Sequence, residues 1–132
     1  MMKKVVRTDK EWRELLTSEQ YHILRKKETE APNSCGLLLN KERGAYVCIG
    51  CGNKLFKSEK KFESGTGWPS FFEPFSKDSL EYREDNALGM DRTEVLCAKC
   101  DGHLGHVFND GPKPTGKRYC INGVVLRFVK EK

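Results

Sequence analysis

Four of the six cysteines form two pairs whose spacing is typical of metal ligands. Cys48 and Cys51 are one CxxC pair, and Cys97 and Cys100 are a second. Two intervening residues let both thiolates of a pair face one tetrahedral ion, for which Zn–S distances are about 2.3 Å. Four thiolates leave no open coordination position, so the pattern predicts one structural zinc ion that contributes folding free energy. A pair of buried or redox-active CxxC motifs is the alternative, but the βαβ pattern that accompanies redox-active pairs is absent.

A glycine stands shortly after the second cysteine of each pair, at Gly52 and at Gly102. Glycine adopts the left-handed backbone conformation without steric cost, so we expect both residues to allow a tight turn. Each pair also lies at the end of a β-prone run, which is typical of a zinc ribbon.

Cys120 lies outside these pairs, and its neighbours could make it a nucleophile. Arg118 places cationic charge near the thiol, which lowers a thiol pKa where the side chains converge. Residues at i and i+2 share one face of a strand, so Arg118, Cys120 and Asn122 can line one surface. Groups that could transfer protons stand upstream, at His103, His106 and Asp110. These are the parts of a cysteine nucleophile with proton donors, while an inert core cysteine and structural histidines remain open alternatives.

The segment from Ser64 to Phe72 combines glycines with aromatic residues. Gly65 and Gly67 precede Trp68 directly, and glycines around an aromatic cluster can shape an open, apolar pocket wall. A tight turn that carries a core tryptophan is the alternative interpretation.

Three motifs together resemble those of the methionine sulfoxide reductases of type B. They are GTGWPSF, CDGHLGHVFNDGP and RYCIN, which occur in this order and with the two CxxC pairs. The similarity runs from about Leu15 to Phe128. It implies a mainly β fold of two antiparallel sheets with short N-terminal helices and a four-cysteine zinc site. It also implies reduction of the R epimer of methionine sulfoxide, free or in proteins, to methionine.

The resemblance implies a role for each matching residue. Cys120 matches the nucleophile, which attacks the sulfoxide sulfur and is left as a sulfenic acid. His106 and Asp110 match polar residues of the active site, and a histidine near a carboxylate suits protonation of the leaving oxygen. The substrate-binding positions are Trp68, His103, Phe108, Arg118 and Asn122. The four paired cysteines match the zinc ligands, and thioredoxin or another thiol is the implied reductant.

The sequence departs from the family pattern at Thr66, where many members carry a resolving cysteine. Threonine cannot form a disulfide, so the sulfenic acid of Cys120 must be reduced by another route. One hypothesis is that Cys35 resolves Cys120, because Cys35 is the other cysteine outside the metal pairs. Direct attack by thioredoxin or another external thiol is the alternative, and it is slightly favoured because nothing in the sequence places Cys35 near the pocket.

The residues that precede the motifs predict a helical lead-in over residues 8–28. Thr8 and Glu11 fit a capping box at the start of one helix, and Thr17 with Gln20 fits a cap at the start of a second. The apolar residues expected to pack on the rest of the chain are Trp12, Leu15, Leu16, Tyr21 and Leu24.

The residues from 44 to 130 predict an antiparallel β core, so that the chain forms one domain over residues 1–132. The β-prone runs are 45–49, 81–84, 93–96, 106–108 and 124–129. Turn-forming segments rich in glycine, proline and asparagine separate the runs. Asn122 and Gly123 fit either a hairpin turn or the interior of a longer strand.

The composition indicates one mildly basic globular domain. A length of 132 residues suits a single domain, and the formal net charge of +5 comes without a long run of one sign. No stretch approaches the roughly 18 apolar residues of a membrane span, and no apolar region follows the N-terminal lysines as in a secretory signal. The cytoplasm is therefore the expected compartment, where thiols stay reduced.

Two other function classes stand beside the reductase. A noncatalytic zinc-ribbon module that binds protein or nucleic acid would explain the CxxC pairs and the positive charge, but not Cys120, Trp68 and His106 in family order. A Cys–His hydrolase would need an oxyanion arrangement that the sequence does not show. We therefore expect a monomeric enzyme that acts on oxidised proteins or peptides, with no nucleic-acid or membrane partner.

Overall fold

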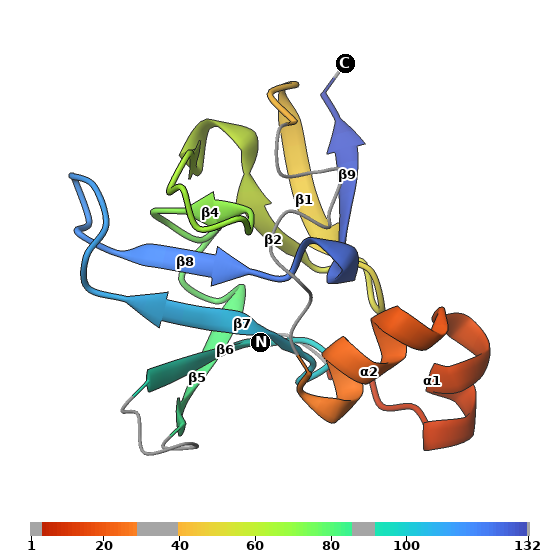
Figure 1. Ribbon diagram of the computed structural model, residues 1–132. Coiled ribbons are helices and arrows are strands. Elements are labelled where there is room, and N and C mark those ends of the chain that lie inside the picture. The colour runs from red at the N-terminus through yellow and green to blue at the C-terminus, as the bar shows by residue number, and fades with distance from the viewer. Residues whose placement is uncertain (1–3, 29–39, 86–91, 132) are drawn as a thin grey trace.

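The computed structural model describes residues 4–28, 40–85 and 92–131, which form two β-sheets and two short helices (Figure 1). Every strand pairing in both sheets is antiparallel. The predicted fold class, mainly β with two antiparallel sheets and short N-terminal helices, is confirmed. Among the described residues, no helix is long and apolar enough to cross a membrane.

The smaller sheet has the strand order β2-β1-β9. Its strands are β1 (Gly44–Cys48), β2 (Lys54–Lys57) and β9 (Leu126–Lys130). Figure 1 shows these three strands side by side, with β9 ending near the C-terminus. Since β1 is the central strand, its Tyr46 and Cys48 are almost completely buried. The first metal-ligand pair therefore begins at the end of a well-covered strand.

The larger sheet has the strand order β3-β4-β8-β7-β6-β5. Its strands are β3 (Lys61–Phe62), β4 (Ser70–Phe71), β5 (Leu80–Asp85), β6 (Arg92–Cys97), β7 (His103–Phe108) and β8 (Arg118–Ile121). The predicted runs at 81–84, 93–96 and 106–108 all lie within these strands. Because β7 and β8 have neighbours on both sides, the histidine and cysteine motifs are held by the interior of the sheet.

Stacked aromatic side chains join the two sheets. The rings of Phe56, from the smaller sheet, and Phe71, from the larger sheet, are parallel with centroids 4.2 Å apart. Tyr46 meets the edge of Phe71 at 5.2 Å, and Phe56 meets Tyr119 at 5.8 Å. Offset and edge-to-face contacts of this kind add to the free energy gained by burying large rings. This layer fixes how β8, which carries Cys120, lies on the smaller sheet.

The chain crosses from the larger to the smaller sheet directly after β8. Asn122 is followed by a 3₁₀ turn, η3 (Gly123–Val125), and then by β9. The predicted strand over 124–129 therefore begins later, at Leu126, because Val124 and Val125 belong to the turn. Asn122 and Gly123 form neither the predicted hairpin nor the interior of a strand.

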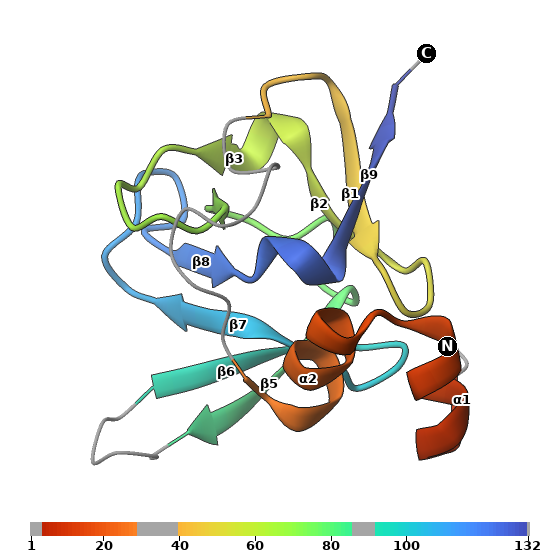
Figure 2. The same cartoon turned by 45° about the vertical axis from the view of Figure 1, so that its right-hand side comes forward.

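The helices α1 (Asp9–Leu15) and α2 (Ser18–Lys26) pack at the end of the sheets where the metal-ligand turns lie (Figure 2). α1 begins with the predicted capping box at Thr8, and the cap predicted at Thr17 is a capping box as well. Leu15, predicted to pack inward, is half exposed instead. The reason is that Trp12 and Leu16, one helical turn apart, already define the buried side.

Candidate active site and metal centre

The four paired cysteines meet at one point between the two sheets. Their Sγ atoms all lie within 4.8 Å of one another. Cys48 and Cys100 are 3.7 Å apart at Sγ, and Cys51 and Cys97 are 3.5 Å apart. A tetrahedral ion with metal–sulfur bonds of about 2.3 Å requires sulfur separations of about 3.8 Å. The cluster can therefore hold one metal ion, as the spacing predicts.

The two metal-ligand turns share one backbone shape. The residue directly after the second cysteine is left-handed in both, with φ of 77° at Gly52 and 61° at Asp101. Its N–H donates to the carbonyl of the first cysteine at 2.8 Å in each turn. The role predicted for glycine is thus confirmed at Gly52 but wrong at Gly102, where Asp101 takes the left-handed position.

Gly102 has a packing role instead, because α2 lies directly against it. A β carbon at Gly102 would lie 2.5 Å from Cδ1 of Leu24, and one at Gly50 would lie 2.9 Å from Cδ2 of the same leucine. The guanidinium of Arg25 donates to the carbonyl of Cys100 at 2.8 Å. The helical lead-in therefore covers the metal-ligand turns from outside.

The thiols of the cluster differ in their tendency to ionise. Hydrogen bonds from Cys100, Cys48 and Cys51 hold the pKa of the Cys97 thiol well below its ordinary value. Hydrogen bonding to Cys100 and to the other two thiols, together with burial, raises the pKa of the Cys48 thiol. A buried cluster that cannot readily ionise all four thiols by itself is a site that a cation stabilises.

Cys120 lies apart from the cluster, in a cavity of about 280 Å³ on the larger sheet. Predicted site residues on its wall are Trp68, His106, Phe108, Arg118, Cys120 and Asn122. The wall also contains Thr66, Arg92 and Gly105. The structure thus brings together the predicted nucleophile, a predicted proton donor and the predicted aromatic residues.

Strand register explains why Cys120 and His106 are neighbours. The two residues are directly opposite in the pairing of β8 with β7. Directly opposite residues of antiparallel strands project on the same face of a sheet, so the thiol and the imidazole face the same cavity. A β carbon at Gly105 would lie 2.0 Å from the carbonyl oxygen of Cys120, so only glycine permits this approach of the strands.

Arg118 forms one wall of the cavity and is held by Asp110. Its Nε donates to Asp110 Oδ1 at 2.9 Å, and its guanidinium lies 4.4 Å from the centroid of the Phe108 ring. The same ion pair keeps the pKa of the Asp110 carboxyl below its ordinary value. Asp110 itself is exposed and lines a neighbouring hollow. The structure therefore places Asp110 beside Arg118 and not on the cavity wall.

The carboxylate that contacts His106 is Asp85, at the end of β5. His106 Nε2 lies 2.8 Å from Asp85 Oδ2, and the carboxylate is almost completely buried. Arg92 approaches Asp85 at 3.5 Å, and Lys27 approaches it at 3.8 Å. A buried carboxylate with cationic neighbours stays ionised and orients the imidazole that it contacts.

His103 lies behind His106 and not on the cavity wall. The two rings meet edge-on with centroids 5.5 Å apart, and His103 Nδ1 lies 2.8 Å from Glu94 Oε2. Lys27, the C-cap residue of α2, pairs with Glu94 at 3.1 Å. Burial lowers the pKa of His103, against the opposing effect of Glu94. The neutral ring therefore donates its Nδ1–H to Glu94 and supports His106 from behind.

Asn122 combines a place on the cavity wall with a structural contact. Both its backbone N–H and its side-chain amide donate to the carbonyl of Leu104, at 2.9 and 3.0 Å. These bonds fix the end of β8 against the start of β7. Cys35, the predicted candidate for the resolving thiol, lies outside the described residues.

The sequence prediction does not include Asp85 or Glu94, the two buried carboxylates of this region. Glu94 stands within the predicted run 93–96, and Asp85 directly follows the run 81–84. A carboxylate in a buried strand needs a cationic or hydrogen-bonding partner. That requirement is the signal that could have connected both residues to the histidine motif.

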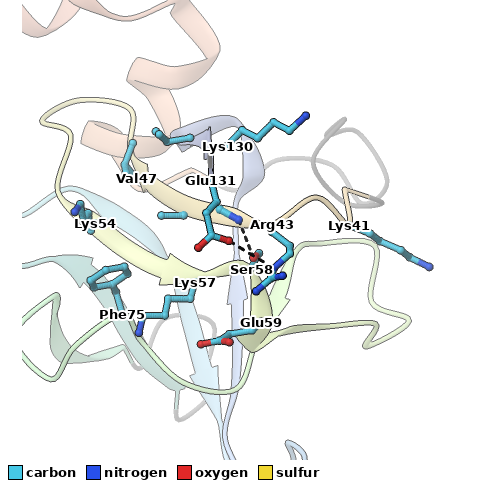
Figure 3. Close-up of a pocket in the computed structure, with 13 residues that line it drawn as sticks. Lys41, Arg43, Val47, Lys54, Lys57, Ser58, Glu59, Phe75, Lys130 and Glu131 are labelled. Atoms are coloured by element: carbon cyan, nitrogen blue, oxygen red, sulfur yellow. Dashed lines mark hydrogen bonds and ion pairs between the residues drawn. The ribbon is translucent and has the colours of Figure 1, made fainter.

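A larger cavity, of about 630 Å³, lies on the outer face of the smaller sheet. Figure 3 shows Lys54 and Lys57 near Phe75 on one side, and Arg43 paired with Glu131 on another. The Arg43 ion pair measures 3.5 Å. The lining of this larger cavity contains neither cysteine nor histidine. This cavity therefore offers no thiol chemistry, and the smaller cavity around Cys120 is the candidate active site.

The fold and this cavity define a class of protein. A half-buried cysteine faces a carboxylate-bound histidine between two aromatic walls, and a separate four-cysteine cluster can bind a metal ion. Such a cavity provides a nucleophilic thiol, a proton donor and an apolar binding surface, which together are typical of the active site of a thiol-dependent enzyme.

Comparison with known proteins narrows the class. The model of the SelR domain family matches residues 16–130. A protein of Methanosarcina mazei named peptide methionine sulfoxide reductase MsrB is 56% identical over 128 residues, which cover 97% of this chain and 91% of that protein. A protein of the same name from Leptospira interrogans is 54% identical over 127 residues, covering 96% and 97%. Another, from Pseudomonas fluorescens, is 53% identical over 128 residues, covering 97% and 98%.

The chain belongs to the SelR family. The resemblance that the three sequence motifs indicate is thereby confirmed.

Proposed function

We propose that the protein reduces the R epimer of methionine sulfoxide in oxidised proteins and peptides to methionine. The observation that carries the proposal is the cavity in which Cys120 faces His106 between Trp68 and Phe108. Near full-length relatives at more than half identity bear the name of this activity. As a member of the family, the chain is a peptide-methionine (R)-S-oxide reductase.

The cavity matches the two ends of a methionine sulfoxide side chain. The methyl group is apolar and packs on Trp68 and Phe108, whereas the sulfoxide oxygen is a strong acceptor and faces His106. Arg118 lies on the strand of the thiol, and Asn122 directly follows that strand. Since methyl, oxygen and peptide each require a different subsite, only one sulfoxide epimer presents its sulfur to Cys120.

The reaction transfers one oxygen atom to Cys120. The thiolate attacks the sulfoxide sulfur while one proton from His106 reaches the oxygen. The oxygen then moves to the sulfur of Cys120 as the bond between the two sulfurs and the sulfur–oxygen bond of the substrate break. Methionine leaves with its sulfur reduced by two electrons, and Cys120 becomes a sulfenic acid, oxidised by two electrons. Asp85 holds His106 in position for this transfer, with His103 and Glu94 behind it.

Two external thiols then regenerate the enzyme. The first attacks the sulfenic acid and releases water, which leaves a mixed disulfide on Cys120. The second attacks that disulfide and restores the Cys120 thiol. Thioredoxin or another thiol serves as reductant, because Thr66 stands beside Cys120 at 3.8 Å and cannot form a disulfide.

The four-cysteine cluster holds one zinc ion, which crosslinks the two metal-ligand turns and supplies folding free energy. The donor set supports this assignment, since four sulfur ligands in tetrahedral reach favour zinc over harder cations. The cavity around Cys120 contains none of these ligands, so the metal acts on stability and not on the sulfoxide.

The working form is a monomeric single domain in the cytoplasm. Cavity and cluster are both built from one chain, so neither requires a second copy. A reducing compartment suits a protein whose described cysteines are all free thiols. The alternative of a noncatalytic zinc-ribbon module gives no role to the Cys120 cavity.

Separate R and S epimers of dabsylated methionine sulfoxide, incubated with dithiothreitol, test the function. We expect reduction of the R epimer only, and a loss of about 1,000-fold or more in the Cys120→Ser variant. Reduction of neither epimer, or unchanged activity of Cys120→Ser, contradicts the proposed function.

Mass mapping after a single turnover tests the route of regeneration. We expect Cys120 as a sulfenic acid or a mixed disulfide with the added thiol, and full thiol-dependent turnover in Cys35→Ser. A Cys35–Cys120 disulfide together with loss of turnover in that variant supports Cys35 as the resolving thiol instead.

A further inference from the structure

Three hydroxyl groups form a hydrogen-bonded chain that ends at the Cys120 sulfur. Thr66 Oγ1 lies 3.8 Å from Cys120 Sγ. Ser64 Oγ lies 2.8 Å from Thr66 Oγ1 and 2.7 Å from Ser70 Oγ. The sulfoxide reaction described above assigns no role to any of these hydroxyls.

Backbone conformation directs the Thr66 hydroxyl toward the thiol. Gly65 and Gly67, on either side of Thr66, have φ of 76° and 90°, which residues with a side chain rarely adopt. The backbone N–H of Trp68 donates to Thr66 Oγ1 at 3.5 Å. At the other end of the chain, Ser70 is buried and lies directly opposite Cys120 in the pairing of β4 with β8.

The hydrogen bonds of this chain have a definite direction. Ser70 donates its one hydroxyl hydrogen to the carbonyl of Trp68 at 3.1 Å, so the 2.7 Å contact requires Ser64 to donate to Ser70. Ser64 then has no hydrogen left, so Thr66 donates to Ser64. With its own hydrogen used, Thr66 can only accept, so its contact with Cys120 is a hydrogen bond when the thiol carries S–H. This direction is therefore that of the neutral thiol.

A thiolate has no hydrogen to donate, and its negative charge favours the opposite direction, in which the hydroxyl hydrogens point toward the sulfur. We propose that Thr66 is a catalytic residue that turns its hydroxyl to donate to the Cys120 thiolate, and that Ser64 and Ser70 turn with it. Ser64 then donates to Thr66, and Ser70 donates to Ser64. Each hydroxyl keeps one donated bond in both states, and the thiolate gains a charge-assisted hydrogen bond at its end of the chain.

Besides the hydroxyl of Thr66, several ionisable side chains lie near the thiol. Arg118 lies on the same strand, His106 is opposite on β7, Arg92 begins β6, and Asp110 reaches the cavity only through its ion pair with Arg118. Both arginines keep their charge throughout the neutral range. Their contribution to the field at Cys120 is therefore constant across the pH range in which the thiol is measured.

Two substitutions separate the hydroxyl of Thr66 from its shape. Thr66→Val keeps the branched side chain and removes the hydroxyl, whereas Thr66→Ser keeps the hydroxyl and removes the methyl. The intact metal-loaded protein is alkylated with iodoacetamide at a series of pH values and is then digested. Mass spectrometry of the peptide that contains Cys120 gives the alkylation rate at each pH. Melting temperatures of both variants verify that the fold is retained.

We expect the midpoint of Cys120 alkylation to rise by about one pH unit in Thr66→Val, which is about tenfold less thiolate at neutral pH, and to stay near the parent value in Thr66→Ser. An unchanged midpoint in Thr66→Val overturns the proposal. So does an equal rise in both variants, because the loop's packing would then be responsible.

The catalytic role of Thr66 rests on the proposed reductase function, but alkylation does not require that activity. Reduction of the R epimer by Thr66→Val should fall about tenfold at neutral pH and recover as the pH rises. If the parent protein reduces no sulfoxide while the alkylation midpoints shift as expected, the proposed function fails and the hydrogen bond stands. If the sulfoxide is reduced and the midpoints do not shift, only the role of Thr66 fails.

Discussion

The metal cluster and the Cys120 cavity place cysteine in two different surroundings on one fold. In the cluster, Cys97 and its three partners lie within 4.8 Å of one another under the cover of α1 and α2. In the cavity, Cys120 is half-buried and has hydroxyl, imidazole and guanidinium groups for neighbours. Thiols that face each other favour a shared cation, whereas a single thiol among donors favours a reactive thiolate.

This difference shows that partner groups, and not the cysteine itself, decide between stability and chemistry. Each region takes at least one cysteine from the larger sheet, since β6 ends at Cys97 and β8 contains Cys120. Matched substitutions in the two regions test whether stability and chemistry are separable in this fold.

Cys97→Ser should cost about 4 kcal/mol or more of unfolding free energy, because the proposed zinc ion would lose a buried ligand and most of the folding free energy that it would provide. Cys120→Ser, the same chemical change in the cavity, should alter that free energy by less than about 1 kcal/mol. Urea denaturation of both variants measures the difference. Equal losses would mean that the two regions are not separate in stability.

Asp85→Asn should lower kcat for the R epimer by about 10- to 100-fold, because His106 loses the carboxylate that orients it. Asp110→Asn is the matched change in a carboxylate that contacts Arg118 and not His106, and it should cost only a few-fold. Steady-state kinetics of the two variants decide which carboxylate serves the histidine. A larger loss in Asp110→Asn would return the role of proton-transfer partner to Asp110.

Gly102→Ala should cost about 1–3 kcal/mol, because the added methyl group would lie 2.5 Å from Leu24 and push α2 away from the metal-ligand turn. Gly116→Ala is the matched control: φ is 71° there and nothing lies within 4 Å, so only backbone strain of about 1 kcal/mol remains. Thermal melts compare the two. A cost at Gly102 no larger than at Gly116 contradicts the packing role.

Stability should fall as the pH drops below about 6.5, with His103 contributing at most about 1.4 kcal/mol per pH unit. Burial lowers the pKa of His103, so the unfolded chain binds more protons than the folded chain in this range. The contribution is present in full above the ordinary histidine pKa and is lost as pH falls through the folded value. Denaturation at pH 7 and pH 5 measures it, and an equally steep fall in His103→Gln assigns the dependence to other groups.

Local signals in the sequence located most of the fold. The capping residues Thr8 and Thr17 were predictable because each cap is read from residues three positions apart. Strand positions followed from β-branched and aromatic runs. The switch between sheets at Gly123–Val125 was not predictable, since two valines favour a strand locally and only the packing of β9 on β1 makes them a turn.

The candidate site also contains residues that the sequence indicates and residues that it does not. Cys120, His106 and Trp68 carry recognisable motifs, and the structure places them on one cavity wall. Asp85 belongs to a strand far from His106 in sequence, so their contact depends on the order of strands in the sheet. The resemblance implies an active-site role for Asp110, and the structure adds that its carboxylate pairs with Arg118, a contact that no motif indicates.

The end of α2 has a consequence for how the chain can vary in length. Leu24 fills the space above Gly102, and Lys27, at the helix C-cap, reaches Glu94 and Asp85 behind the histidines. One added residue between these two would rotate Lys27 by about 100° around the helix axis and carry it away from both carboxylates. An insertion or deletion between Leu24 and Lys27 therefore separates the packing of α2 on Gly102 from its ion pairs with the two carboxylates.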